Sequence, residues 1–207
     1  GTVILNGKSY KRPKPLKMLW RPDRVTCIYK VGGVNITEVK FIDQNDVLAS
    51  IISADQDLTI EFTGHSFVND AEFPTWDGDK AGQTFSQART ASSNYDKDSN
   101  TIHVTEGGTI LTKSGWKETK VGKIMYNGMS IAISSTASFG DTVKLRRDKQ
   151  GRQVYSFSID IKAGQSETLT YAQDDKYDVA LNNSKKLIAA PAKALEEKFQ
   201  WFNNLLN

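Results

Sequence analysis

Hydrophobic and polar residues alternate along most of the chain with a period of two, which is typical of β-strands that are buried on one side. The clearest example is segment 24–31, whose apolar face consists of Val25, Cys27, Tyr29 and Val31. Further strand patterns cover residues 2–6, 9–12, 16–20, 34–42, 47–53, 58–63, 101–105, 109–113, 122–126, 129–135, 142–147, 153–161 and 166–171. Turn residues (Gly, Asn, Asp) separate these segments at short intervals. This rhythm predicts a mainly β protein with an antiparallel sandwich or barrel.

The alternation lapses between residues 69 and 100. This stretch is polar, rich in Asp, Ser, Gly and Ala, and carries scattered aromatic residues. Irregular segments of this length inside a compact domain are usually functional loops or disordered insertions. We therefore predict a long loop or insertion at 69–100.

The end of the chain has a different period. From Pro191 onward, large apolar residues recur at spacings of four, three and four: Leu195, Phe199, Phe202 and Leu206. Such spacing predicts an amphipathic helix, whose apolar stripe is widened by Trp201 and Leu205. A weaker helical segment at 179–189 precedes it, and Pro191 is expected to separate the two helices.

Runs of strands followed by helices predict a β-domain with a helical appendix rather than alternating βαβ units. We place the antiparallel β-sandwich at 1–177 and a helical linker at 178–207. The aromatic stripe needs a cover, which is either the sandwich itself or a following domain. The sequence favours a following domain, with an interface made by Leu195, Phe199, Trp201, Phe202 and Leu206.

Charge and composition exclude several classes of partner. The net charge of the 207 residues is +3, and no Lys/Arg cluster is interleaved with aromatic residues, so nucleic acid is not an expected partner. The basic runs 8–17 and 144–152 are interpreted as solvated hairpin faces. No apolar run is long enough to span a membrane. The start at Gly1 is compatible with a signal peptide that has been removed.

The sequence lacks the residue patterns that usually bind metals and cofactors. Cys27 is the single cysteine, and its place in an alternating strand predicts a buried thiol. His65 and His103 are the two histidines, and neither lies in a zinc-binding spacing. No nucleophile elbow and no phosphate-binding glycine loop occurs, so no cofactor is predicted.

Carboxylate pairs are harder to judge because glycosidase acid/base pairs leave no short motif. Trp76, Asp77 and Asp79 form the one candidate substrate-contact cluster: a ring for sugar stacking beside carboxylates that bind hydroxyl groups. The alternative is a plain turn with Trp76 on the rim of the sandwich. The two aspartates also have calcium-loop spacing, but too few oxygen ligands follow. No complete catalytic apparatus is visible.

Two parts of the chain resemble the N-terminal domain of bacterial glycoside hydrolases of family 63 and related clans, which pair a β-sandwich with an (α/α)6 barrel. The first part comprises the strand patterns VNITEVKFI at 34–42, DVLASIIS at 46–53 and DLTIEFTG at 57–64. The second comprises ETLTY at 167–171, the helical segment 180–190 and PAKALEEKFQWF at 191–202. These are patterns of residue type rather than invariant signatures.

The resemblance implies a large supersandwich of the galactose-mutarotase-like kind that ends in a linker helix. The function it implies is that of a non-catalytic domain in an exported (periplasmic or extracellular) six-hairpin glycosidase. The domain would brace the catalytic barrel, which would supply two carboxylates for inverting hydrolysis of an oligosaccharide. Loop 69–100, with Trp76, would reach the substrate.

Two alternatives remain open at this point. The chain could be a stand-alone carbohydrate-binding or surface-adhesion sandwich, or a mutarotase-like enzyme that acts through a histidine and a carboxylate. Burial of the terminal helix separates them: an open stripe favours the domain of a larger enzyme, and a stripe sealed against the sandwich favours the stand-alone proteins.

Overall fold

The structure is a computed structural model that describes residues 1–65, 95–104, 110–116, 129–147, 149, 153–174 and 176–206. Within these ranges only the backbone is described at residues 65, 95–101, 103, 111–116, 129, 153 and 206.

Strands make up most of the described chain, and two helices follow them. The strands are β1 (Thr2–Leu5), β2 (Lys8–Lys11), β3 (Lys17–Arg21), β4 (Arg24–Val31), β5 (Val34–Ile42), β6 (Leu48–Ala54), β7 (Leu58–His65), β8 (Tyr95–Val104), β9 (Ile110–Trp116), β10 (Met129–Ser135), β11 (Lys144–Arg147), β12 (Gln153–Ile161) and β13 (Ser166–Asp174). The helices are α2 (Tyr177–Ala189) and α3 (Pro191–Leu206), and a 3₁₀ turn, η2, spans Gly140–Thr142.

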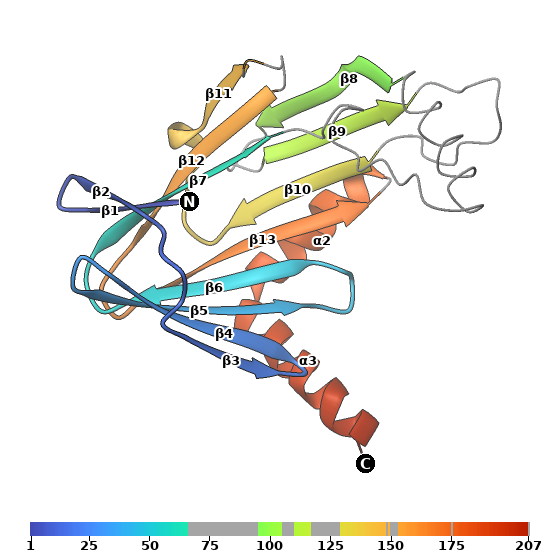
Figure 1. Ribbon diagram of the computed structural model, residues 1–207. Helices are drawn as coiled ribbons and strands as arrows, with labels where there is room; N and C mark the ends of the chain where they lie inside the picture. The colour runs from blue at the N-terminus through green and yellow to red at the C-terminus, as the bar shows by residue number, and fades with distance from the viewer. Residues whose placement is uncertain are drawn as a thin grey trace, which may run out of the picture.

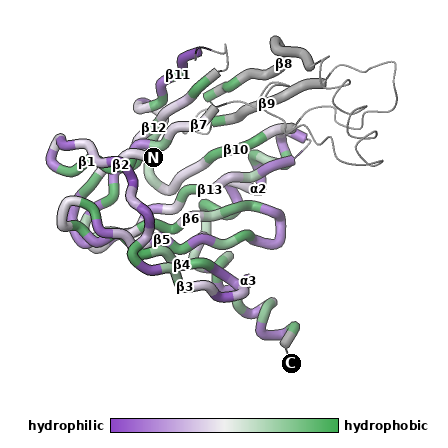
Figure 2. The backbone as a smooth tube through the Cα atoms, viewed as in Figure 1, coloured by the Kyte–Doolittle hydropathy of each residue, from purple (hydrophilic) through white to green (hydrophobic). Residues whose placement is uncertain are grey.

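These strands form two antiparallel sheets (Figure 1). The smaller sheet has the order β11-β12-β7-β1-β2, and the larger has the order β3-β4-β5-β6-β13-β10-β9-β8. In Figure 2 the tube changes between hydrophobic green and hydrophilic purple along the strands of both sheets. This alternation puts apolar side chains on the inner face of each sheet, and the predicted β-sandwich is confirmed.

The main core lies between the two sheets. Phe157 of β12 is 1% exposed, and its ring centre lies 4.5 Å from that of Phe139. Inward-facing residues of both sheets complete the cluster, among them Val3, Tyr29, Ile36, Ile60, Ile110, Ile133, Ile159 and Leu169. Cys27 belongs to this core with a buried thiol, as predicted.

A second apolar cluster lies between the outer face of the larger sheet and the helices. It contains Phe41, Val47, Ala49, Ala132, Ala172, Ala180 and Leu187. The alanines on β6, β10 and β13 allow α2 to approach the sheet closely, and α2 lies behind it in Figure 1. Buried Ser184 of α2 hydrogen-bonds with Thr170 and donates to the hydroxyl of Ser134, both at 2.8 Å.

The two helices are separate, as the proline predicts. Ala190, which lies between them, has φ −152° and ψ 62°, outside the helical region. Helix α2 spans Tyr177–Ala189 and begins two residues before the predicted helical segment 179–189. None of the described helices has the length and apolar character that crossing a bilayer requires.

Some predicted boundaries differ from those observed. Strand β8 begins at Tyr95, inside the stretch 69–100 that was predicted to be irregular, and its register shifts between Asp96 and Thr101. Thr142 ends η2, so β11 begins two residues later than predicted. The predicted strand 122–126 lies outside the described residues.

The described residues of the two basic runs are largely solvated, as predicted. All four side chains of β11 are exposed, and three of the four on β2 are exposed. Arg12, directly after β2, is the exception, because its guanidinium group turns inward to a buried carboxylate.

Candidate functional site

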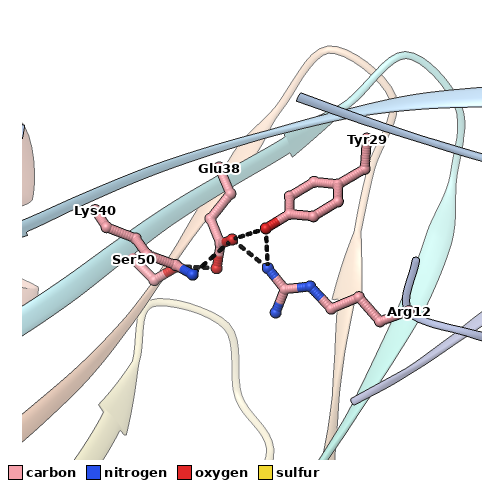
Figure 3. A network of polar contacts seen from close by, with 5 residues as sticks. All are labelled: Arg12, Tyr29, Glu38, Lys40 and Ser50. Atoms are coloured by element: carbon pink, nitrogen blue, oxygen red, sulfur yellow. Dashed lines mark hydrogen bonds and ion pairs between the residues drawn. The ribbon is translucent and has the colours of Figure 1, made fainter. Parts of the chain in front are cut away.

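A buried carboxylate lies on the core-facing side of the larger sheet (Figure 3). Glu38 of β5 is 2% exposed. Its Oε1 accepts a hydrogen bond from the Ser50 hydroxyl at 2.6 Å, and its Oε2 accepts one from the Tyr29 hydroxyl at 2.9 Å. Arg12 also donates to Oε2, and the Lys40 ammonium lies 3.1 Å from the same oxygen. We call these five residues the Glu38 network.

The network determines the protonation states of its members. Burial alone would raise the pKa of Glu38, but the Ser50 hydrogen bond and the charges of Arg12 and Lys40 hold it below the ordinary value. Burial, followed by the negative charge of Glu38, raises the pKa of Tyr29 to about 12. Glu38 is therefore ionised and Tyr29 neutral at neutral pH.

The position of Arg12 indicates what the network does. Arg12 follows the edge strand β2 of the smaller sheet, whereas Tyr29, Glu38, Lys40 and Ser50 all lie on the larger sheet. A cavity of about 10 Å³, roughly the space of one water molecule, lies beside Arg12, Tyr29 and Glu38 between apolar walls. The Glu38 network thus joins the two sheets. Its carboxylate is single, and both oxygens are engaged, so it offers no second carboxylate for a glycosidase pair.

Beyond this network, several side chains on the core-facing side of the larger sheet are exposed. Trp20 pairs with Val25, and Met18 pairs with the core residue Cys27. Directly opposed residues of antiparallel strands point to the same face, so Met18 and Trp20 point to the core-facing side. Their exposed fractions are nevertheless 60% and 72%.

The same exposure continues on the neighbouring strands. Ile42 of β5 lies four residues after Glu38, so its side chain points to the same face of the sheet. It pairs with Leu48 of β6. Their exposed fractions are 50% and 40%. The ends of β3, β5 and β6 involved lie at the right in Figure 1, whereas β1 and β2 lie at the left. We call Met18, Trp20, Ile42 and Leu48 the shelf.

Helix α3 is attached to the opposite side of the same corner. The guanidinium carbons of Arg21 and Arg24 lie 5.2 and 5.8 Å from the centre of the Phe199 ring. Both arginines hydrogen-bond to Asp23, at 3.1 and 2.6 Å. Burial opposes ionisation of Asp23, but the two arginines lower its pKa below the ordinary value. Asp23 thus holds both cations where they face the ring.

The predicted interface residues of α3 divide between two environments. Leu195 packs against the cluster beneath the helices, and Phe199 and Phe202 are half-buried. Trp201 is 43% exposed, with its ring centre 6.0 Å from that of Phe202 and 4.6 Å from the Lys198 ammonium. The side chain of Leu206 is not among those described. The stripe is therefore partly sealed by its own domain and partly open.

Other predicted site residues lie outside the described part. Trp76, Asp77 and Asp79 are not among the described residues, and neither are the side chains of His65 and His103. Within the described residues, no group of three His, Cys, Asp or Glu side chains is arranged to hold a metal ion.

Sequence reasoning missed Glu38 and Asp23. A signal for Glu38 was present: in VNITEVKFI it occupies the inward parity set by Val34 and Ile36, where a carboxylate requires a buried partner. No comparable signal marked Asp23, because Pro-Asp reads as an ordinary turn.

Comparisons with known proteins support the fold. No protein-family model matches the chain, and no curated protein matches it. Among solved structures, "Putative kojibiose phosphorylase from human microbiome" superimposes with a TM-score of 0.52 and 11% sequence identity. The match covers 98% of this chain and 27% of that chain. At this identity the match shows a shared fold, and it shows that the chain spans about a quarter of the length of this neighbour.

Proposed function

We propose that this chain is a non-catalytic β-sandwich domain, N-terminal to a catalytic (α/α)6 barrel, in an enzyme that cleaves glycosidic bonds. The observation that carries the proposal is the match to the kojibiose phosphorylase, in which nearly the whole chain corresponds to 27% of a longer protein. The resemblance to six-hairpin glycosidases rests on residue patterns in the sequence rather than on a superposition of structures. It also leads to an enzyme that cleaves glycosidic bonds.

The chemistry of the described residues supports a bracing role. Glu38 and Asp23, the two buried carboxylates, are each bound by two cations, and the pKa of each is lowered. A general acid needs a raised pKa, close to the working pH. These carboxylates are therefore suited to holding the sandwich together, and the catalytic pair would be supplied by the barrel.

The reaction of the parent enzyme is either hydrolysis or phosphorolysis. The family resemblance implies inverting hydrolysis by two carboxylates, whereas the structural neighbour is named as a phosphorylase. In both cases an oligosaccharide is the substrate, and loop 69–100 with Trp76, Asp77 and Asp79 would contact it. Export to the periplasm or the cell exterior is part of the same proposal.

The test is to express the full natural reading frame and to assay it on kojibiose and other oligosaccharides, with and without inorganic phosphate. We expect a helix-rich catalytic region after the sandwich and release of free sugar or sugar phosphate. Trp76→Ala should raise KM more than it lowers kcat if the loop contacts substrate. A reading frame without such a region, or one inactive on every oligosaccharide, would contradict the proposal.

A stand-alone carbohydrate-binding sandwich is the second candidate, favoured by the 72% exposure of Trp20. An exposed indole is the kind of flat apolar surface on which a sugar ring can stack. Calorimetry of this chain with a glycan panel tests this candidate. Binding that is lost in Trp20→Ala would support it, and the absence of heat with every glycan would exclude it.

A further inference from the structure

We propose that Asp23 is a positioning residue of the parent enzyme. By holding two arginines against Phe199, it sets the direction of α3 and, with it, the place of the catalytic domain that follows the sandwich. This inference rests on the proposed function and deepens it, because it assigns the geometry of the domain junction to one carboxylate.

Helix α3 is attached to the sandwich more lightly than α2. Three side chains of α2 are buried, namely Ala180, Ser184 and Leu187. By contrast, none of the α3 side chains that the structure describes is fully buried. The backbone at Ala190 leaves the helical region, so α3 does not continue the axis of α2. Figure 1 shows the C-terminal part of α3 projecting beyond the strands. The direction of α3 therefore depends on its own contacts with the larger sheet.

Two attachment points along α3 define this direction. Leu195 packs against the apolar cluster beneath the helices. Phe199, one turn later, faces the two arginines, whose guanidinium carbons lie 5.2 and 5.8 Å from the ring centre. At a rise of about 1.5 Å per residue, the two points are about 6 Å apart and Leu206 lies about 10 Å beyond Phe199. A shift of about 1 Å at Phe199, with Leu195 fixed, therefore displaces the end of the helix by about 3 Å.

The arginine pair in turn depends on Asp23. Arg21 and Arg24 are directly opposed in the register of β3 and β4, and like charges in this position repel each other. Asp23 lies in the turn between the two strands and is 4% exposed. It accepts a hydrogen bond from each guanidinium group, at 3.1 and 2.6 Å. Its negative charge offsets the repulsion, so both cations can face one ring.

A simpler role for Asp23 is to stabilise the turn itself, because aspartate is common in turns. Asparagine is also suited to turns but carries no charge, so Asp23→Asn separates the two roles. If the side chain serves only the turn, this variant leaves α3 in place. If it positions α3, the arginines separate, Phe199 loses its contact, and the helix is released from an intact hairpin.

The test on this chain is a distance measurement between two spin labels, one on β4 (Lys30→Cys) and one near the end of α3 (Leu205→Cys). Both positions are exposed, and the native Cys27 is buried and stays unlabelled. We expect a narrow distance distribution with Asp23 present and one about twice as wide in Asp23→Asn. An unchanged width would overturn the inference.

A reference pair of labels lies entirely on the sandwich, at Lys30→Cys and Gln165→Cys. Both positions are exposed, and Gln165 lies in the turn between β12 and β13. The distribution of this pair should stay narrow in Asp23→Asn. If it widened too, Asp23 would support the sandwich as a whole, and the inference would be overturned.

Two further variants make the assignment specific. Phe199→Leu should widen the distribution between Lys30→Cys and Leu205→Cys, and combining it with Asp23→Asn should widen it no further, because both substitutions break the same contact. Glu38→Gln is the matched control. Glu38 is also a buried carboxylate bound by two cations, but it lies on the core-facing side of the sheet. Additive widening in the double variant, or widening in Glu38→Gln, would overturn the inference.

The consequence for the enzyme is measured in the product of the full reading frame. A misplacement of about 1 Å can lower a rate about a hundredfold. We expect Asp23→Asn to lower kcat/KM by about tenfold, since both catalytic carboxylates would lie on the barrel and stay together. Glu38→Gln should leave kcat/KM unchanged at a temperature where both variants are folded.

The two proposals fail in different ways. An active enzyme in which Asp23→Asn releases α3 but leaves kcat/KM unchanged would overturn the positioning role and leave the proposed function standing. An active enzyme in which Asp23→Asn does not release α3 would do the same. A reading frame without a catalytic region would overturn both proposals.

Discussion

The guanidinium carbon of Arg21, on the edge strand β3, lies 5.2 Å from the centre of the Phe199 ring on the last helix. This contact joins the third strand of the chain to its last described helix. Arg21 is held by Asp23, which also holds Arg24 against the same ring. The orientation of α3 therefore depends on a buried carboxylate as well as on the apolar residues beneath the helix.

Replacing Phe199 should loosen α3 without unfolding the sandwich. We expect Phe199→Ala to cost about 1–2 kcal/mol of local stability, from two partly exposed cation–π contacts and half-buried ring area. Hydrogen exchange of the α3 amides should accelerate while exchange in β4 and β5 stays unchanged. Phe199→Leu keeps apolar area but removes the π system. Its α3 exchange rates should lie between those of the wild type and those of Phe199→Ala. The control Leu205→Ala should have no such effect, and an equal effect would contradict the assigned contact.

Removing the charge of Glu38 should destabilise the whole sandwich. Glu38→Gln leaves Arg12 and Lys40 without their shared counter-ion. Breaking a fully buried pair costs about 3–5 kcal/mol, and we expect roughly 2 here because water reaches both cations. Urea unfolding measures the loss.

The matched control for this substitution is Glu197→Gln. Glu197 is an exposed carboxylate 3.7 Å from Lys193 on α3. Surface pairs of this kind are worth about 0–1 kcal/mol. Equal losses in the two variants would show that the Glu38 network does not join the sheets in the way the geometry indicates.

The stability that Glu38 contributes should depend on pH in the acid range. Its pKa in the folded protein is lower than the ordinary glutamate value of 4.5, so folding favours the charged form. The contribution is complete above 4.5 and is lost as the pH falls through the folded pKa. The difference in unfolding free energy between wild type and Glu38→Gln should therefore shrink from neutral pH towards pH 3. The pKa of Asp23 is also lowered, but Asp23 is present in both proteins, so its contribution cancels in the difference. A constant difference would mean that folding does not lower the pKa of Glu38.

The strands were predictable because their period is a local property. The segments 24–31 and 34–42 coincide with β4 and β5, since strict alternation and the Gly32-Gly33 turn fix both ends. Both glycines adopt positive φ, 57° and 93°, as a tight hairpin requires. By contrast, strand order is non-local: β1 pairs with β7, and β6 pairs with β13, and nothing in their own residues specifies these partners.

The candidate site was less predictable for the same reason. The helical stripe was visible, but which part of it would be covered depended on Arg21 and Arg24, far away in the sequence. Met18 and Trp20 read as an ordinary apolar strand. Their exposure shows that none of the described strands of the smaller sheet covers them. Sequence periodicity predicts which face a side chain occupies, but not whether another sheet lies over it.

The attachment of α2 provides a last prediction. Ser184, Thr170 and Ser134 are 0%, 0% and 6% exposed, and their hydroxyl groups form a chain from the helix to two strands of the larger sheet. Ser184→Ala removes the central hydroxyl and leaves its two buried neighbours each short of one partner. Such a loss costs about 1–3 kcal/mol.

The expected result is a lower unfolding midpoint in urea with an unchanged slope, because the compactness of the folded state is preserved. Ser184→Cys keeps a weak donor and acceptor of similar size and should recover part of the loss. Asn182→Ala is the control on the same helix, since Asn182 is exposed and alanine favours helix formation. If Ser184→Ala were as neutral as this control, the hydroxyl chain would contribute nothing to holding α2, and apolar packing around Leu187 and Ala180 would have to account for its attachment.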